Sequence, residues 1–253
     1  MDKRFILILL VLIVGFFGIM TISKKDNAVE SGSTGSSQGS SNYYGKEDSP
    51  VTITEFVDFQ CEACYAYYPY VKQVKEMYRD QVRFQIRYFP ITSGHKFAMQ
   101  AAKNAEAAAR QDKFWEMHDK LFEGQKTWEQ APDPQVYFDQ YAESIGLNME
   151  QFNTDRMSGS VNDVVNADLK AVQAIGGTGT PTFAINGKKV EKTLPSVEAL
   201  SKMIEDALKE AGITPKPAAQ PASSQTMPTS GSGGLNPGET QVEHDRETQQ
   251  GQQ

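Results

Sequence analysis

The chain has 253 residues, of which 39% are apolar, and it carries a net charge of −7 at pH 7. This length allows one ordinary domain with long extensions, and the modest apolar content suggests that part of the chain stays outside any folded core. The acidic balance argues against nucleic acid or an anionic membrane surface as the main partner. Only two cysteines are present, Cys61 and Cys64, so no thiol remains for a structural disulfide elsewhere or for a four-thiolate zinc site.

The N-terminus contains an uncharged apolar run of 18 residues within residues 1–22, directly after Lys3 and Arg4. Since a helix rises about 1.5 Å per residue, this run just crosses a hydrocarbon core of roughly 30 Å. It has no Ala-x-Ala cleavage site, which favours an uncleaved signal-anchor over a processed signal peptide or a buried core helix. Lys3 and Arg4 favour a cytoplasmic N-terminus, although Lys24 and Lys25 reduce the charge difference. We expect a single-pass protein of the cell membrane with an extracytoplasmic domain.

Two segments have the composition of unfolded chain. Residues 23–42 include a nearly continuous run of Gly, Ser, Thr and Gln, which predicts a flexible linker after the anchor. Residues 213–253 are rich in Pro, Ser, Thr, Gly and Gln, which predicts a disordered tail. Residues 43–212 remain for one folded domain.

The folded part opens with a predicted strand–helix–strand unit. Residues 51–57 are mostly β-branched or aromatic, which is typical of a strand. After Cys61, apolar residues recur with the spacing of one helical face as far as Tyr78. Residues 82–89 alternate between polar and apolar side chains and predict a second strand. Together these segments form a βαβ unit.

Residues 95–175 are predicted to be a helical insertion. An alanine-rich face near its start indicates tight helix packing. Asp112 is expected to cap a helix that continues through Phe122. Further helices are expected over residues 134–145 and 148–174.

A second β-containing half follows the insertion. Strands are predicted over residues 181–185 and 188–191, joined by Asn186-Gly187, a pair that favours a two-residue hairpin. A last helix over residues 196–211 begins at a capping serine and ends before a glycine. The order is β-α-β, a helical insertion, then β-β-α, which belongs to the α/β class.

The two cysteines lie where the first strand gives way to the helix. Residues i and i+3 are neighbours on one helical turn, so the sulfurs of Cys61 and Cys64 can meet. Cys61 then lies at the helix N-terminus, where unpaired N–H groups and the helix dipole stabilise a thiolate. Cys61 is predicted to exchange disulfides while Cys64 resolves the mixed disulfide. Half of a zinc site completed by His95 or His118, and an inert structural disulfide, are the alternatives. We expect no metal and no cofactor.

Four stretches of the chain together resemble one known family. They are YGKEDSPVTITEFVDFQCEAC at residues 44–64, Pro69 in the following helix, KFWEMHDKLF at residues 113–122 and GTPTF at residues 179–183. Over about residues 43–210 the chain is similar to DsbA-type disulfide oxidoreductases, especially the membrane-tethered extracytoplasmic members of Gram-positive bacteria. The resemblance implies a thioredoxin fold with a helical insertion between the βαβ half and the ββα half.

The resemblance also implies a substrate-binding loop at Thr180 and Pro181. Pro181 is expected to form a cis peptide bond beside the two cysteines. A proline that opens a strand there leaves the backbone of Thr180 available to pair with an extended substrate. A strand-edge proline with no substrate contact is the alternative.

Glu55 occupies the place of a buried acidic residue in the family. A buried acid with a raised pKa can exchange protons with Cys64 through water. The alternatives are that Glu55 faces solvent or that Asp58 faces the cleft instead. Arg87 is a possible charge partner of Glu55.

One departure concerns the two residues between the cysteines. Close relatives usually have proline after the first cysteine and often histidine before the second, whereas this chain has Glu62 and Ala63. Glu62 places negative charge near the thiolate, and Ala63 offers no side-chain donor. Both differences are expected to raise the pKa of Cys61 relative to a strongly oxidising member and to make the disulfide less oxidising.

We therefore expect a thiol–disulfide oxidoreductase that forms disulfides in newly exported, cysteine-containing proteins through Cys61 and Cys64. The resemblance implies reoxidation by a quinone-linked membrane partner. An extracytoplasmic reductase or isomerase is the nearest alternative. A membrane-tethered, chaperone-like module that binds peptides beside Thr180 and Pro181 is a second alternative.

Overall fold

The structure is a computed structural model that describes residues 38–191 and 194–218. The membrane anchor predicted over residues 1–22, most of the predicted linker and most of the predicted tail lie outside the described residues. Within the described part, no helix combines the length and the apolar character needed to cross a membrane.

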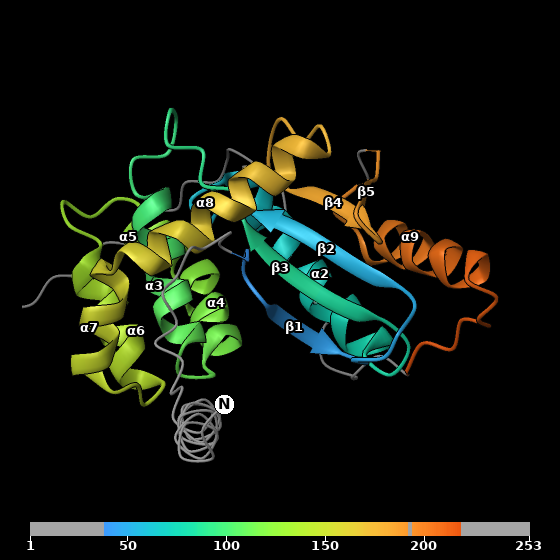
Figure 1. The fold of residues 1–253 in the computed structure, drawn as a ribbon, viewed down its shortest axis with the longest axis horizontal. Helices are drawn as coiled ribbons and strands as arrows, with labels where there is room; N and C mark the ends of the chain where they lie inside the picture. The colour runs from blue at the N-terminus through green and yellow to red at the C-terminus, as the bar shows by residue number, and fades with distance from the viewer. Residues whose placement is uncertain (1–37, 192–193, 219–253) are drawn as a thin grey trace, which may run out of the picture. The chain divides into compact units, whose positions relative to one another are not determined.

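Five strands of the described chain form one mixed sheet (Figure 1). They are β1 Asn42–Gly45, β2 Thr52–Val57, β3 Arg83–Tyr88, β4 Thr182–Ile185 and β5 Lys188–Lys189. Their spatial order is β1-β3-β2-β4-β5, with β2 parallel to β3 and antiparallel to β4. β2 is therefore the central strand, hydrogen-bonded on both edges.

The helices of the described chain interrupt and follow these strands in the predicted order. They are α2 Glu62–Tyr78, α3 Ala98–Ala109, α4 Phe114–Glu123, α5 Gln125–Trp128, α6 Gln135–Ser144, α7 Met149–Met157, α8 Gly159–Ala174 and α9 Val197–Glu210. Helices α3 to α8 all lie between β3 and β4, so they form the expected insertion. The predicted α/β class and the β-α-β, insertion, β-β-α order are confirmed.

Helices cover both faces of the sheet because β2 sends alternate side chains to opposite sides. Ile53 belongs to the apolar core that β2 shares with α2 and α9. Phe56 packs on the opposite face against Val172 of α8. In Figure 1, α8 crosses in front of the sheet while α2 lies behind it. Glu55 has the same parity as Ile53 and so points toward α2.

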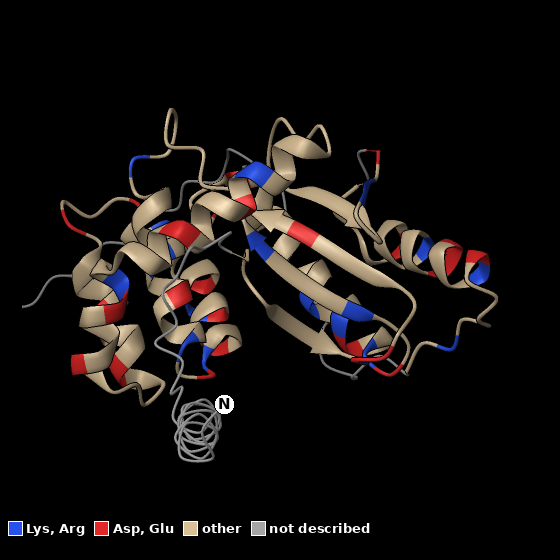
Figure 2. Cartoon of the chain, in the orientation of Figure 1, with Lys and Arg blue, Asp and Glu red and all other residues tan. Residues whose placement is uncertain are grey.

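The predicted hairpin and the predicted cap of the last helix are confirmed. Asn186 and Gly187 form the predicted hairpin turn with φ values of 48° and 78°, a left-handed conformation that asparagine and glycine adopt most readily. The hydroxyl of Ser196 accepts a hydrogen bond from the backbone N–H of Ala199 and caps α9. Lys and Arg are interspersed with Asp and Glu along α9 (Figure 2), as on a solvent-facing helix.

Two local predictions were wrong. Asp112 does not cap α4: it has a left-handed φ of 58°, and the N-cap is Lys113 with no side-chain hydrogen bond. The helix predicted over residues 148–174 is broken at Ser158, whose extended backbone ends α7 and whose hydroxyl caps α8 through Val161 N–H. Serine is a favoured N-cap residue, but the helical pattern of residues 148–174 continues on both sides of Ser158, so the break was not predicted.

The folded domain extends beyond both predicted boundaries. Ser40, assigned to the linker, is buried, and β1 begins at Asn42. At the other end, Ile213 packs against the core under α9, and Gln81 hydrogen-bonds the backbone of Thr214. β1 was not predicted because its short polar sequence is a strand only through pairing with β3.

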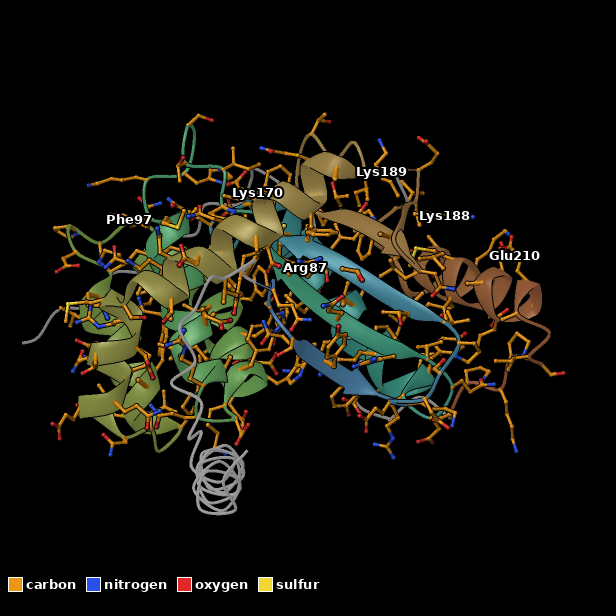
Figure 3. The ribbon with its side chains drawn as sticks, viewed as in Figure 1. Arg87, Phe97, Lys170, Lys188, Lys189 and Glu210 are labelled. Carbon is orange, nitrogen blue, oxygen red and sulfur yellow. The ribbon has the colours of Figure 1, made fainter. Side chains whose placement is uncertain are left out.

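A buried carboxylate joins the N-terminal segment to the sheet and the insertion. Asp168 on α8 has no exposed side-chain surface. It accepts hydrogen bonds from the backbone and hydroxyl of Ser40, from the backbone N–H of Tyr88 and from Arg87 Nε at 2.6 Å. Figure 3 labels Arg87 at the sheet beside α8. The predicted pairing of Arg87 with Glu55 is wrong, because the two side chains leave opposite faces of the sheet.

Replacement of the buried carboxylate should strongly destabilise the domain. Asp168→Ala leaves Arg87 without its partner and the hydroxyl of Ser40 without its acceptor. We expect a loss of about 3–5 kcal/mol in the free energy of unfolding, measured by urea denaturation. Asp206→Ala, which removes an exposed ion pair with Lys202 on α9, should leave the denaturation midpoint nearly unchanged. Equal midpoint shifts in the two variants would contradict this account.

Candidate active site

The end of β2 leads through a tight turn into the first turn of α2. The backbone N–H of Cys61 donates to Asp58 O at 3.1 Å, and Cys61 O accepts the first helical hydrogen bond from Tyr65 at 3.0 Å. Cys61 is the N-cap, with extended dihedral angles (φ −73°, ψ 126°). Cys61 therefore lies at the N-terminus of α2, where the backbone N–H groups have no acceptor within the helix.

The two cysteine side chains are close but have opposite environments. Both are free thiols; Cys61 keeps 8% of its surface exposed and Cys64 only 1%. The Cys64 thiol hydrogen-bonds to Cys61 and, together with Thr180 and the backbone N–H groups of Cys64 and Ala63, lowers the pKa of Cys61 to about 5 against the opposing effect of burial. Burial first, and then the neighbouring Cys61 sulfur and Glu55, raise the pKa of Cys64 well above its usual value.

The predicted loop at Thr180 and Pro181 lies against the reactive cysteine. The Thr180–Pro181 peptide bond is cis, as expected. The sulfur of Cys61 lies 3.6 Å from the carbonyl oxygen of Thr180. Among the described atoms, the buried hydroxyl of Thr180 has no hydrogen-bond partner. A hydrogen bond from the Thr180 side chain to a Cys61 thiolate contributes to the lowered pKa of Cys61.

An open groove borders this loop. It has a volume of about 410 Å³ and is lined by Ala63 and Tyr67 of α2, by residues 178–183 and by Lys189 to Glu191. The groove thus runs from the start of α2 along the loop to β5 at the edge of the sheet. The groove borders Thr180, whose carbonyl oxygen lies 3.6 Å from the Cys61 sulfur, so an extended peptide in it would lie next to the loop that contacts Cys61.

Glu55 lies in the middle of the central strand and is only 5% exposed. Burial raises its pKa to about 8. Its charge contributes to the raised pKa values of Cys64 and Tyr67, which places it close to both. The prediction that Glu55 is a buried acid is confirmed, and the alternative of a solvent-facing strand residue is wrong. Its part in proton exchange stays a prediction.

Asp58, the alternative acid, has a different task. Its carboxylate accepts hydrogen bonds from the backbone of Gln60 and Ile91 at 2.8 Å each and contacts His95 Nδ1 at 2.7 Å. Asp58 therefore ties the active-site turn to the segment after β3. His118 is buried in an aromatic cluster and hydrogen-bonds to Asp119.

The structure also bears on the zinc alternative and on Glu62. Across residues 38–191 and 194–218, no three His, Cys, Asp or Glu side chains are grouped so that they could hold a metal ion. Glu62 is exposed and lies 3.2 Å from Lys126 Nζ of α5. Its negative charge beside Cys61 is therefore partly offset by a cation that sequence spacing did not reveal.

One buried contact to the active-site turn was missed at the sequence level. Gln125 of α5 is fully buried and donates hydrogen bonds to the carbonyl oxygens of Phe59 and Cys61. The available signal was weak: a single glutamine between the apolar residues Phe122 and Trp128 of the insertion.

Comparison with known proteins places this geometry in a family. A family model described as thioredoxin matches residues 37–206. The chain is 36% identical over 182 residues to Na(+)/H(+) antiporter NhaA 3 of Salinispora tropica and 34% identical over 183 residues to Na(+)/H(+) antiporter NhaA 1 of Salinispora arenicola. Each alignment covers 70% of this chain and 26% of the relative, so the chain spans about a quarter of the length of these curated relatives.

Solved structures show the same fold. Alpha-DsbA1 of Wolbachia pipientis has a TM-score of 0.58 and 19% identity, covering 67% of this chain and 92% of that chain. Oxidised BdbD of Bacillus subtilis has a TM-score of 0.56 and 26% identity, covering 66% and 92%. A thioredoxin-like oxidoreductase from Silicibacter pomeroyi has a TM-score of 0.54 and 23% identity, covering 67% and 91%. The expected thioredoxin fold is confirmed, and the helical insertion agrees with the DsbA-like neighbours.

Removal of the buried acid should change how stability depends on pH. Because the pKa of Glu55 is raised from 4.5 to about 8 in the folded chain, the unfolded chain ionises first as pH increases. Stability is therefore lost between about pH 4.5 and pH 8. Glu55→Gln should remove this loss and raise the free energy of unfolding by about 2–3 kcal/mol at pH 7. It should also slow the step of disulfide exchange in which Cys64 takes up a proton.

Glu106→Gln is the matched control for this experiment. Glu106 is also buried, burial raises its pKa to about 7, and it accepts a hydrogen bond from Tyr88 rather than lying near the cysteines. It should alter the pH dependence of stability without affecting disulfide exchange. An unchanged pH slope in Glu55→Gln would refute the raised pKa of Glu55.

Proposed function

Because the chain belongs to the thioredoxin family and has the fold of its DsbA-like thiol–disulfide oxidoreductases, we propose that Cys61 and Cys64 are its redox centre and that it oxidises cysteine pairs in other proteins. The observation that carries the proposal is the opposite shift of the two thiols. The pKa of Cys61 is lowered to about 5, whereas that of Cys64 is raised. Such a pair has one sulfur that leaves as a thiolate and one that retains its proton.

The reaction starts from the Cys61–Cys64 disulfide. A substrate thiolate attacks the sulfur of Cys61, the disulfide breaks, and Cys64 departs with the electron pair and takes up a proton. Glu55 is the proposed proton donor to Cys64, since its raised pKa keeps it protonated at neutral pH. A second substrate thiolate then attacks the substrate sulfur of the mixed disulfide. Cys61 leaves as a stable thiolate, the substrate gains a disulfide, and the two cysteines are left reduced.

The pKa of Cys61 supports oxidation as the working direction. Its value of about 5 lies between about 7 for thioredoxin and about 3.5 for DsbA. Ionisation of Cys61 at pH 7 stabilises the reduced form by about 3 kcal/mol relative to an unperturbed thiol, which makes the disulfide roughly 60 mV more oxidising.

The substrates proposed are unfolded or newly exported proteins with free cysteines, bound as extended segments in the groove beside Thr180 and Pro181. The proposal places the domain outside the cytoplasmic membrane, tethered by residues 1–22, because disulfides persist in that compartment. A quinone-linked membrane oxidant would then remove the two electrons left on Cys61 and Cys64 after each turnover. A reductase or isomerase would need a different electron partner and a lower reduction potential, near the value of about −270 mV for thioredoxin.

Substitution of each cysteine should separate their tasks. Cys61→Ser should abolish the oxidation of a dithiol peptide, because no exposed sulfur remains to exchange. Cys64→Ser cannot form the Cys61–Cys64 disulfide, so it should also fail to oxidise the dithiol peptide. When it is given a disulfide-bonded peptide instead, its Cys61 thiolate should attack that disulfide and form a mixed disulfide that no Cys64 thiol can resolve, so a covalent complex accumulates on non-reducing gels. A Cys61→Ser protein with undiminished peptide oxidation would disprove the proposed reaction.

The relative stability of the two redox forms tests the direction. Since the pKa of Cys61 is depressed to about 5 in the folded reduced protein, its stabilising effect is present at high pH and is lost as pH falls through 5. We expect the free energy of unfolding of the reduced form, relative to the oxidised form, to rise by about 1.4 kcal/mol per pH unit between pH 5 and pH 8. Denaturant unfolding of both forms measures this. An oxidised form that is the more stable one throughout this range would favour the reductase.

A further inference from the structure

Helix α5 of the insertion contacts the turn between β2 and α2 that carries Cys61. Gln125, the first residue of α5, has no exposed surface. Its Nε2 donates to Phe59 O at 2.7 Å and to Cys61 O at 3.1 Å. These two carbonyl groups lie on either side of Gln60, and the second belongs to the reactive cysteine. One amide group of the insertion thus binds both ends of the turn.

The orientation of this amide is fixed by its surroundings. Both neighbours are carbonyl oxygens, which only accept hydrogen bonds, so the NH2 end of Gln125 must face them. The oxygen end of the amide, Gln125 Oε1, then points the other way. It is buried and has no hydrogen-bond partner among the described atoms. A buried acceptor left unsatisfied lowers stability.

Other hydrogen bonds also hold the turn: the backbone N–H of Cys61 donates to Asp58 O, and the backbone N–H of Gln60 donates to the Asp58 carboxylate. Cys61 O also accepts the first hydrogen bond of α2, from Tyr65. The side chain of Gln60 is held by the backbone N–H of Phe97 at 2.7 Å. The Gln125 side chain links Phe59 to Cys61, because its NH2 group hydrogen-bonds the carbonyl oxygens of both residues.

We propose that Gln125 is a positioning residue through which the helical insertion holds Cys61 in the orientation where Cys64 and Thr180 stabilise its thiolate. The inference rests on the proposed function of the cysteine pair, which it deepens. It gives the insertion a task in the chemistry: α5 controls the reactivity of a sulfur that belongs to the other half of the fold. Gln125 does not touch the reacting atoms and acts only through the turn.

The test is a titration of the full-length, reduced Gln125→Met protein. Methionine keeps the length and fills the space but donates no hydrogen bond. The ultraviolet absorbance of the thiolate reports Cys61 alone at and below neutral pH, because the pKa of Cys64 is raised. We expect the titration midpoint of Cys61 to rise by about one pH unit, and the alkylation rate near pH 6 to fall accordingly.

Gln135→Met is the matched control. Gln135 lies in the same insertion and hydrogen-bonds Asn104 and Asp139, away from the cysteines. It should lower the melting temperature without moving the midpoint of Cys61. An unmoved midpoint in folded Gln125→Met, or an equal shift in Gln135→Met, would overturn the inference. The titration measures ionisation and not turnover, so this outcome is independent of whether Cys61→Ser retains activity.

Discussion

The hydrogen bond from the Cys64 thiol to the Cys61 sulfur is the interaction on which the candidate site depends. It is the largest contribution to the lowered pKa of Cys61, and in return it adds to the raised pKa of Cys64. The two thiols share one short segment but differ because Cys61 faces backbone N–H groups at a helix start, whereas Cys64 is enclosed. A single proton is therefore held on one defined sulfur. This asymmetry gives the disulfide a preferred point of attack and a preferred leaving group.

The fold maintains this asymmetry through elements that are distant in the sequence. The central position of β2 keeps Glu55 away from water and near Cys64, whose pKa it helps to raise. The loop before β4 places the side chain of Thr180 where its hydrogen bond lowers the pKa of Cys61, and α5 supports the turn from the insertion. Each contribution comes from a different part of the chain, so the thiolate exists only in the assembled domain. The inserted helices are thereby part of the site and not merely a cover over it.

The sequence predicted what depends on local patterns. The strand–helix–strand unit around Cys61 and the hairpin at Asn186-Gly187 each have a periodicity or turn signal within a few residues. The resemblance added Pro181 and Glu55, which local patterns would not have identified. What was missed is tertiary: β1 is a strand only beside β3, and the partner of Arg87 comes from α8, 81 positions along the chain. Gln125 gave almost no signal, because a buried polar contact leaves no periodic trace.

A tertiary contact also changes the expected effect of Glu62, one of the two residues between the cysteines. Sequence reasoning assigned Glu62 an unfavourable charge beside the thiolate, yet Lys126 lies 3.2 Å from it, with both side chains exposed. Exposed charges at this separation interact weakly and are screened by salt. The hydrogen bonds from Cys64 and from the start of α2 act at shorter range and away from bulk water, where they are stronger. The oxidising character of the site therefore depends more on its buried hydrogen bonds than on the two exposed residues that differ from the family pattern.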